Sequence, residues 1–132
     1  MRFIESLVRS AILAVIALLG VAALAQEGVT KTSIVLGQSV ALTGPGSMLA
    51  VPFQQGAKLY FDRLNATGGI NGRKIDLVTL DDRGSAQITA ANTTKLLDQG
   101  VFSLFGYYGS PQVTASYPQI RDTDEAVTWG EP

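Results

Sequence analysis

The stretch LFGYYGSP, residues 104–111, decides the fold. The apolar run Val101–Phe105 predicts a short buried strand, which breaks at Gly106 and is followed by a helix that starts at Ser110-Pro111. Serine is a favoured N-cap, and proline suits the first helical position because no amide hydrogen is needed there. A helix start at the carboxyl end of a strand offers free N–H groups to an anion such as a carboxylate, and the two tyrosines would form an apolar wall beside it. An ordinary capped turn without a ligand explains the same residues, so both interpretations stay open.

Upstream of this stretch, strand and helix patterns alternate. Short runs of β-branched and apolar residues predict strands, and apolar residues at helical spacing predict helices. The expected segments are a strand over Ser33–Leu42, a loop over Ser47–Pro52, a helix that begins at Phe53, a strand over Lys74–Leu80 and a helix that is capped by Ser85 and runs to about Gln99. In the last helix, we expect Ile88, Ala91, Leu96 and Leu97 to face the core.

Alternating strands and helices predict an α/β fold, namely a parallel sheet with helices on both faces. In such sheets, ligands bind at the carboxyl ends of the strands. Residues 43–52, 81–84 and 106–110 are therefore the candidate site loops. A fourth strand is expected to open at Ala126–Trp129. Because a unit of this size would leave apolar sheet edge uncovered, we expect residues 26–132 to be part of a larger domain.

The first 25 residues have the pattern of a secretory signal peptide. Arg2 and Arg9 flank a short polar region, Ala11–Leu24 is almost wholly apolar, and Ala23 and Ala25 supply the small residues that a signal peptidase requires. A spanning helix needs about 20 apolar residues, so a membrane anchor is the weaker alternative. We therefore expect cleavage after Ala25 and export to the periplasm, with no insertion into the membrane afterwards.

Composition excludes several classes of function. The net charge of −1 provides no basic surface for nucleic acid. Cysteine and histidine are both absent, which removes disulfides, thiolate chemistry and most zinc sites. Neither a metal nor a cofactor is predicted. Asp81 and Asp82 could serve an exported enzyme, but loop capping explains this pair of carboxylates better, so we predict that the protein is not an enzyme.

Four segments match a known family in order and spacing. They are IVLGQS with LTGP, from Ile34 to Pro45; GAKLYFD with NATGGINGR, from Gly56 to Arg73; Asp81-Asp82; and GYYGSP, from Gly106 to Pro111. Together they resemble the type I periplasmic binding proteins of the branched-chain amino-acid (Leu/Ile/Val-binding) family, which are substrate-binding proteins of ABC transporters. The resemblance runs from about Ser33 to Ile120.

The resemblance implies a two-lobed receptor, of which residues 26–132 would be an incomplete first lobe. In the family, a serine or threonine hydroxyl and backbone amides hold the ligand's carboxylate at the loop that matches Gly109 and Ser110. Leu49 and Tyr108 fall where family members place side chains against the ligand, and Tyr107 is expected as a further wall. The residues that usually meet a ligand's amino group belong to the second lobe, so this part alone is not expected to be a competent receptor.

The function that the resemblance implies is that of an exported solute-binding component of an ABC importer. Its partners would be the permease subunits of the transporter and a small carboxylate solute, such as an amino acid. A ligand sensor of the same fold is the alternative.

Overall fold

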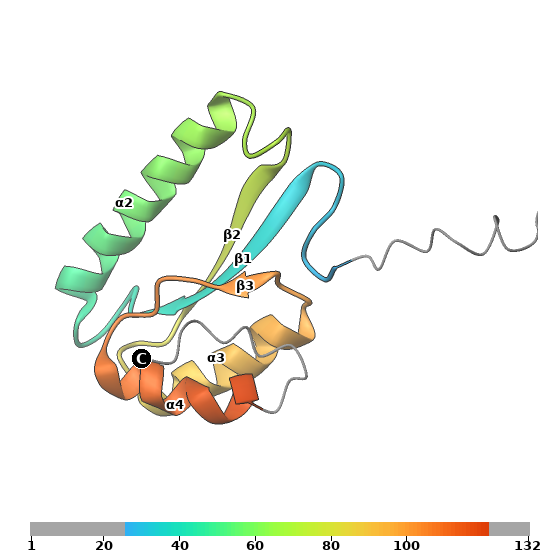
Figure 1. Cartoon of the computed structure of the whole chain (residues 1–132). Coiled ribbons are helices and arrows are strands. Elements are labelled where there is room, and N and C mark those ends of the chain that lie inside the picture. Colours follow the sequence, from blue (N-terminus) through green and yellow to red (C-terminus); the bar gives the residue numbers. More distant parts are fainter. Residues whose placement is uncertain (1–25, 122–132) are drawn as a thin grey trace, which may run out of the picture.

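The computed structural model describes residues 26–121, which form a parallel sheet and three helices (Figure 1). The elements are β1 (Ser33–Val40), α2 (Ser47–Ala66), β2 (Lys74–Asp81), α3 (Ala86–Asp98), β3 (Ser103–Leu104) and α4 (Ser110–Arg121). The strands lie in the order β2-β1-β3, and both pairings are parallel. The predicted α/β class is confirmed. The predicted signal peptide and the strand expected at 126–129 lie outside the described residues.

The helices cover both faces of the sheet. Figure 1 shows α2 on one face and α3 with α4 on the other. The chain moves from β1 outward to β2 through α2, and then returns past β1 to β3 through α3. Because both crossovers are right-handed, this reversal of direction places the two connecting helices on opposite faces. The strand order therefore reverses between β1 and β3, and the loops that follow these two strands flank the reversal point.

The apolar core is small and lies at the carboxyl end of β1. Val40, Ala41 and Ala50 are buried together, and Leu42 and Tyr108 pack against them. On the other face of β1, Gly37 lets α3 approach closely, since a Cβ atom at this position would lie 3.2 Å from Leu96. The best-packed part of the sheet is thus the part that supports the loops at its carboxyl edge.

The start of α2 differs from the prediction. Ser47–Pro52 is not a loop but the first part of the helix. Within this helix, Pro52 has no N–H to donate to the carbonyl of Met48, four residues earlier. Met48 is exposed and Pro52 is not buried, so water can hydrate that carbonyl and the helix continues through the proline. The helix consequently begins directly after the loop that follows β1.

The two strands that flank the reversal point are shorter than predicted. β1 ends at Val40, because the Leu42 amide donates to the Asp81 carboxylate instead of to a strand. Residues 101–105 do run beside β1, and the amides of Phe102 and Phe105 donate to its carbonyls at 2.8 Å, but only Ser103–Leu104 is regular strand. Among residues 26–121, no helix has the length and apolar character that crossing a membrane requires.

Candidate functional site

Asp81 joins the loop after β1 to the loop after β2. Its Oδ1 atom accepts from the backbone N–H groups of Leu42 (2.9 Å), Thr43 (3.2 Å) and Arg83 (2.9 Å). Its Oδ2 atom accepts from the Thr43 hydroxyl at 2.6 Å. Partial burial raises the pKa of Asp81, but these hydrogen bonds outweigh it and hold the pKa below its usual value. This carboxylate therefore has the loop-capping role that the sequence predicted.

Asp81 makes stability depend on pH in the acid range. Because the folded pKa lies below the ordinary value of 3.8, its hydrogen bonds contribute fully above that pH and are lost as the pH falls through the folded pKa. We expect Asp81→Asn, which cannot titrate, to melt at a lower temperature than the wild type at pH 7, with the difference narrowing in acid. Melting temperatures measured from neutral to acidic pH test this. A constant difference across the range would contradict it.

Two glycines let the first two loops touch. Gly84 has a φ of +73°, and a Cβ atom there would lie 2.3 Å from the Pro45 carbonyl oxygen. Gly44, also at +73°, would place a Cβ atom 2.9 Å from the Arg83 carbonyl oxygen. Only glycine permits this close packing of backbone on backbone.

We expect Gly84→Ala to destabilise the protein by clearly more than about 1 kcal/mol, because it combines left-handed strain with a clash against backbone. Gly46→Ala is the matched control. Gly46 also has a positive φ, of 88°, but a Cβ atom there would have no neighbour within 4 Å among residues 26–121. Urea unfolding of both variants measures the difference. Equal losses would show that the loop contact contributes nothing beyond backbone strain.

Asp82 is the centre of a buried polar cluster that the sequence patterns did not predict. The residue is fully buried, and its Oδ2 atom accepts from the hydroxyls of Ser39 (3.1 Å) and Thr89 (3.0 Å). Its Oδ1 atom accepts from the Gly84 amide at 2.9 Å. Asn92 extends the cluster by donating to Ser39 Oγ at 3.1 Å. Hydrogen bonds, rather than a cation, thus compensate this carboxylate for its lost hydration.

The cluster corrects the predicted inner face of α3. Leu96 is buried as expected, but Ile88, Ala91 and Leu97 are not. Instead, the buried residues of the helix are Thr89, Asn92, Thr93 and Leu96. These positions do follow helical spacing, but three of the four residues are polar. A search for periodic apolar residues therefore does not detect this buried face. Within residues 26–121, no group of three or more His, Cys, Asp or Glu side chains could hold a metal ion.

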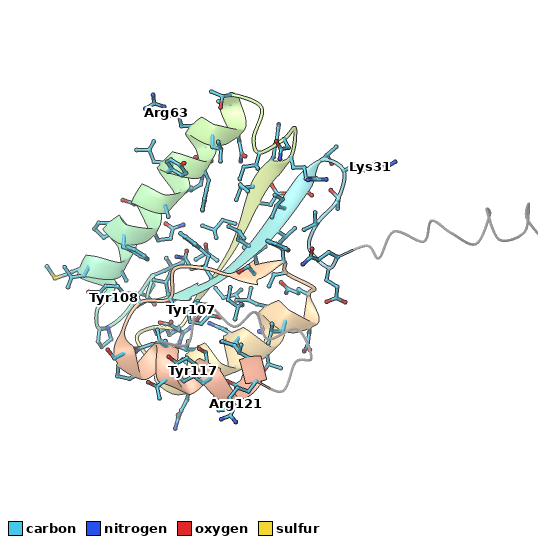
Figure 2. All side chains as sticks on the ribbon, viewed as in Figure 1. Lys31, Arg63, Tyr107, Tyr108, Tyr117 and Arg121 are labelled. Carbon is cyan, nitrogen blue, oxygen red and sulfur yellow. The ribbon has the colours of Figure 1, made fainter. Side chains whose placement is uncertain are left out.

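Tyr107 and Tyr108 point to different parts of the structure (Figure 2). The Tyr107 hydroxyl lies 3.0 Å from that of Thr93 on α3. Burial raises the pKa of Tyr107, the Thr93 hydrogen bond opposes this shift, and the charge of Asp82 adds to it. The ring of Tyr108 packs against Phe53 of α2, with 6.0 Å between centroids. Tyr107 thus anchors the loop against α3, while Tyr108 lies toward the start of α2.

The N-cap of α4 lies one residue earlier than predicted, at Gly109 instead of Ser110. The Val113 amide donates to the Gly109 carbonyl at 3.0 Å, so Gly109 is the N-cap and Ser110 is the first helical residue. Gly109 has a φ of +104°, which favours glycine. Ser110 is exposed, and its hydroxyl makes no hydrogen bond with any other residue in the range 26–121. Within that part of the chain, the hydroxyl is therefore available to a ligand, together with the amides of the first turn.

Leu49 lies in the first turn of α2 with 65% of its surface exposed. Helices α2 and α4 begin after β1 and β3, the two strands that flank the reversal point. Leu49, Tyr108, Gly109 and Ser110 are therefore at the same edge of the sheet. Gln112 ties this edge to the second loop, because its side chain donates to the Gly84 carbonyl at 2.8 Å. The edge combines a helix start that has free first-turn amides with apolar surface.

A pocket of about 520 Å³ lies elsewhere, between the middle of α2 and β2. Its lining includes Lys58 and Asp62, which form an exposed ion pair with each other, and Asn65, which bonds the backbone of Ile75. This pocket follows the outer strand of the sheet, away from the starts of α2 and α4. We therefore place the candidate site at the carboxyl edge, where α4 begins and where the Ser110 side chain is exposed.

A parallel sheet with helices on both faces, and with helix starts at the reversal of strand order, defines a ligand-binding α/β lobe. The chain belongs to the periplasmic binding protein family, whose model matches residues 33–129. The members of this family are solute-binding proteins.

Individual relatives agree with this assignment. The chain is 31% identical over 114 residues to an amino acid binding protein of Pseudomonas aeruginosa, covering 81% of this chain and 30% of that protein. It is 28% identical over 89 residues to Leu/Ile/Val-binding protein homolog 1 of Brucella abortus, covering 67% and 24%. The chain thus spans less than a third of the length of these curated relatives.

Solved structures show the same fold. The branched-chain amino acid transporter substrate-binding protein LivJ of Streptococcus pneumoniae, in complex with isoleucine, matches with a TM-score of 0.65 and 28% identity, over 68% of this chain and 26% of that one. A fatty acid ABC transporter substrate-binding protein of Thermomonospora curvata matches with a TM-score of 0.67 and 33% identity, over 71% and 24%. The resemblance predicted from the sequence is confirmed.

Proposed function

We propose that this chain contributes the carboxylate-binding part of an exported receptor that delivers a small carboxylate solute, such as an amino acid, to an ABC importer. The observation that carries the proposal is the edge formed by Gly109, Ser110, Tyr108 and Leu49 at the reversal of strand order. The hydroxyl of Ser110 and the first amides of α4 bind the carboxylate. Leu49 and Tyr108 contact the apolar body of the solute, and Tyr107 supports the loop from the α3 side.

Binding without turnover is the property to test. Equilibrium dialysis of the protein against isoleucine, phenylalanine and benzoate, each paired with the primary amide that replaces its carboxylate, would measure whether a carboxylate is required. Chromatography of the recovered solute would show whether it is chemically changed. Because the resemblance assigns the contacts to a ligand's amino group to a second lobe, we expect weak retention of at least one carboxylate, no retention of its amide and full recovery of the unchanged solute. Equal retention of acid and amide, or conversion of the solute, would contradict the proposal.

Export is tested separately. If residues 1–25 are a signal peptide, the protein recovered from the periplasm of an expressing bacterium should begin at Gln26. Intact mass spectrometry of that fraction distinguishes this product from the full chain. Recovery of uncleaved protein from the membrane alone would contradict the predicted cleavage and localisation.

A further inference from the structure

Gln38 is a fully buried amide in the middle of the sheet. It lies on β1, and its side chain contacts groups from both neighbouring segments. Its Nε2 atom donates at 3.0 Å to the carbonyl of Gly106, the second residue after the end of β3. Its Oε1 atom accepts from the Thr79 hydroxyl of β2 at 3.2 Å. One side chain therefore connects β2, β1 and the start of the loop that carries Tyr108 and Ser110.

The two hydrogen bonds have distinct roles. The Gly106 carbonyl can only accept, so the end of the amide that faces it must be the nitrogen, and the amide oxygen is left to accept from the Thr79 hydroxyl. A carbonyl needs a donor, so neither a glutamate carboxylate nor an apolar side chain could replace this contact at neutral pH. The Gly106 carbonyl thus sets the orientation of the amide, and the Thr79 hydroxyl of β2 holds the other end of the side chain in place.

Gly106 is shaped to receive this amide. Its φ is +62°, and a Cβ atom there would lie 2.8 Å from Gln38 Nε2 and 3.4 Å from the Phe53 ring. The bare backbone allows the glutamine to reach the carbonyl at the point where the chain leaves the sheet. From that point, only three residues precede Ser110. The direction of the chain at Gly106 consequently determines where the start of α4 lies.

We propose that Gln38 is a positioning residue of the solute site, which holds Gly106 and thereby sets the path of residues 106–110. This inference rests on the proposed function, since it assigns Gln38 an effect on solute affinity without contact with the solute. Loss of the amide lets the loop adopt other conformations. The affinity for solute then falls in proportion to the population of the conformation that binds solute.

Asn65 supplies a matched control at the opposite end of the sheet. Its side-chain amide also makes two hydrogen bonds, donating to the Ile75 carbonyl at 2.8 Å and accepting from the Ile75 amide at 2.7 Å. Ile75 lies near the start of β2, far along the strand from Thr79. Removing either amide costs two partly buried hydrogen bonds, but of the two side chains only Gln38 bonds to the loop after β3.

The experiment compares Gln38→Met with Asn65→Leu, two substitutions that keep side-chain size and remove the amide. Hydrogen exchange measured by mass spectrometry reports the opening of residues 105–113, and NMR titration with L-isoleucine reports affinity. For Gln38→Met, we expect exchange in this segment to be about tenfold faster and binding about tenfold weaker. For Asn65→Leu, we expect faster exchange around Ile75 and binding within about twofold of the wild type.

Each outcome separates the two proposals. Unchanged exchange over residues 105–113 in Gln38→Met would overturn the positioning role, and so would equal losses of affinity in both variants. If the wild type binds no carboxylate while Gln38→Met still loosens the loop, the proposed function fails and the control of the loop path by Gln38 stands. Should Gln38→Met fail to fold, Thr79→Val removes only the hydrogen bond that holds the oxygen end of the Gln38 amide. It is expected to loosen the same segment by about threefold, and no change would overturn the proposal.

Discussion

Replacing Asp82 by alanine is expected to lower the free energy of unfolding by about 3 kcal/mol or more. The change removes a fully buried carboxylate that accepts from Ser39, Thr89 and the Gly84 amide. The Ser39 hydroxyl and the Gly84 amide would lose this acceptor, whereas the Thr89 hydroxyl can still donate to the Ser85 carbonyl at 3.0 Å. Each donor left without an acceptor costs about 1–3 kcal/mol. Asp82→Asn keeps the shape and one acceptor oxygen, so we expect a smaller loss. Urea unfolding followed by circular dichroism measures both.

Asp62→Ala is the control for the Asp82 substitutions. Asp62 also accepts at short distance, from Lys58 at 2.6 Å, but both side chains are more than half exposed. An exposed ion pair one helical turn apart contributes at most about 0.5 kcal/mol. If Asp82→Ala shifted the urea midpoint no more than Asp62→Ala, the buried cluster would not be holding α3 on the sheet.

Replacing Ser110 by alanine is expected to weaken solute binding by about tenfold to a hundredfold with little change in stability. A hydrogen bond to a charged group contributes about 1.5–3 kcal/mol, which corresponds to that range of affinity. The hydroxyl makes no hydrogen bond within residues 26–121, and Gly109 rather than Ser110 provides the cap. The first-turn amides remain in the variant, so part of the anion site persists.

To test Ser110→Ala, the dissociation constant for the solute and the melting temperature are both measured for the variant and for the wild type. Thr114→Ala, an exposed hydroxyl one turn further along α4, is the matched control and should change neither. A lower melting temperature with unchanged affinity would assign the Ser110 hydroxyl to the helix rather than to the solute.

The sequence predicted the alternation of strands and helices well, because those signals are local. Apolar runs, glycines and a capping serine at position 85 sufficed to place β1, β2 and α3 within a few residues. The prediction for Ser47–Pro52 was wrong because the effect of a proline on a helix depends on whether the freed carbonyl reaches water. That exposure is a property of the fold and not of the local sequence.

The contacts inside the site were harder to predict for a related reason. The cluster of Ser39, Asp82 and Asn92 joins residues that are distant in sequence. Their contacts can be predicted only once the strand order is known. The two tyrosines were expected to form one wall, but consecutive residues in an extended segment point in opposite directions. A polar face on α3 also explains why Tyr107 finds a hydroxyl partner there. Pairing across strands, rather than local propensity, determines these contacts.

The central claim is that a carboxylate binds at the start of α4, and an NMR titration of the isotope-labelled chain with L-isoleucine tests it most directly. We expect the amide resonances of Gly109, Ser110 and Gln112 to shift together, and those near Leu49 to move with them. L-isoleucinamide, which lacks the carboxylate, should leave these resonances in place, and amides near Ile75 should stay unchanged with both compounds. Shifts confined to the α2–β2 pocket, or identical responses to the acid and the amide, would contradict it.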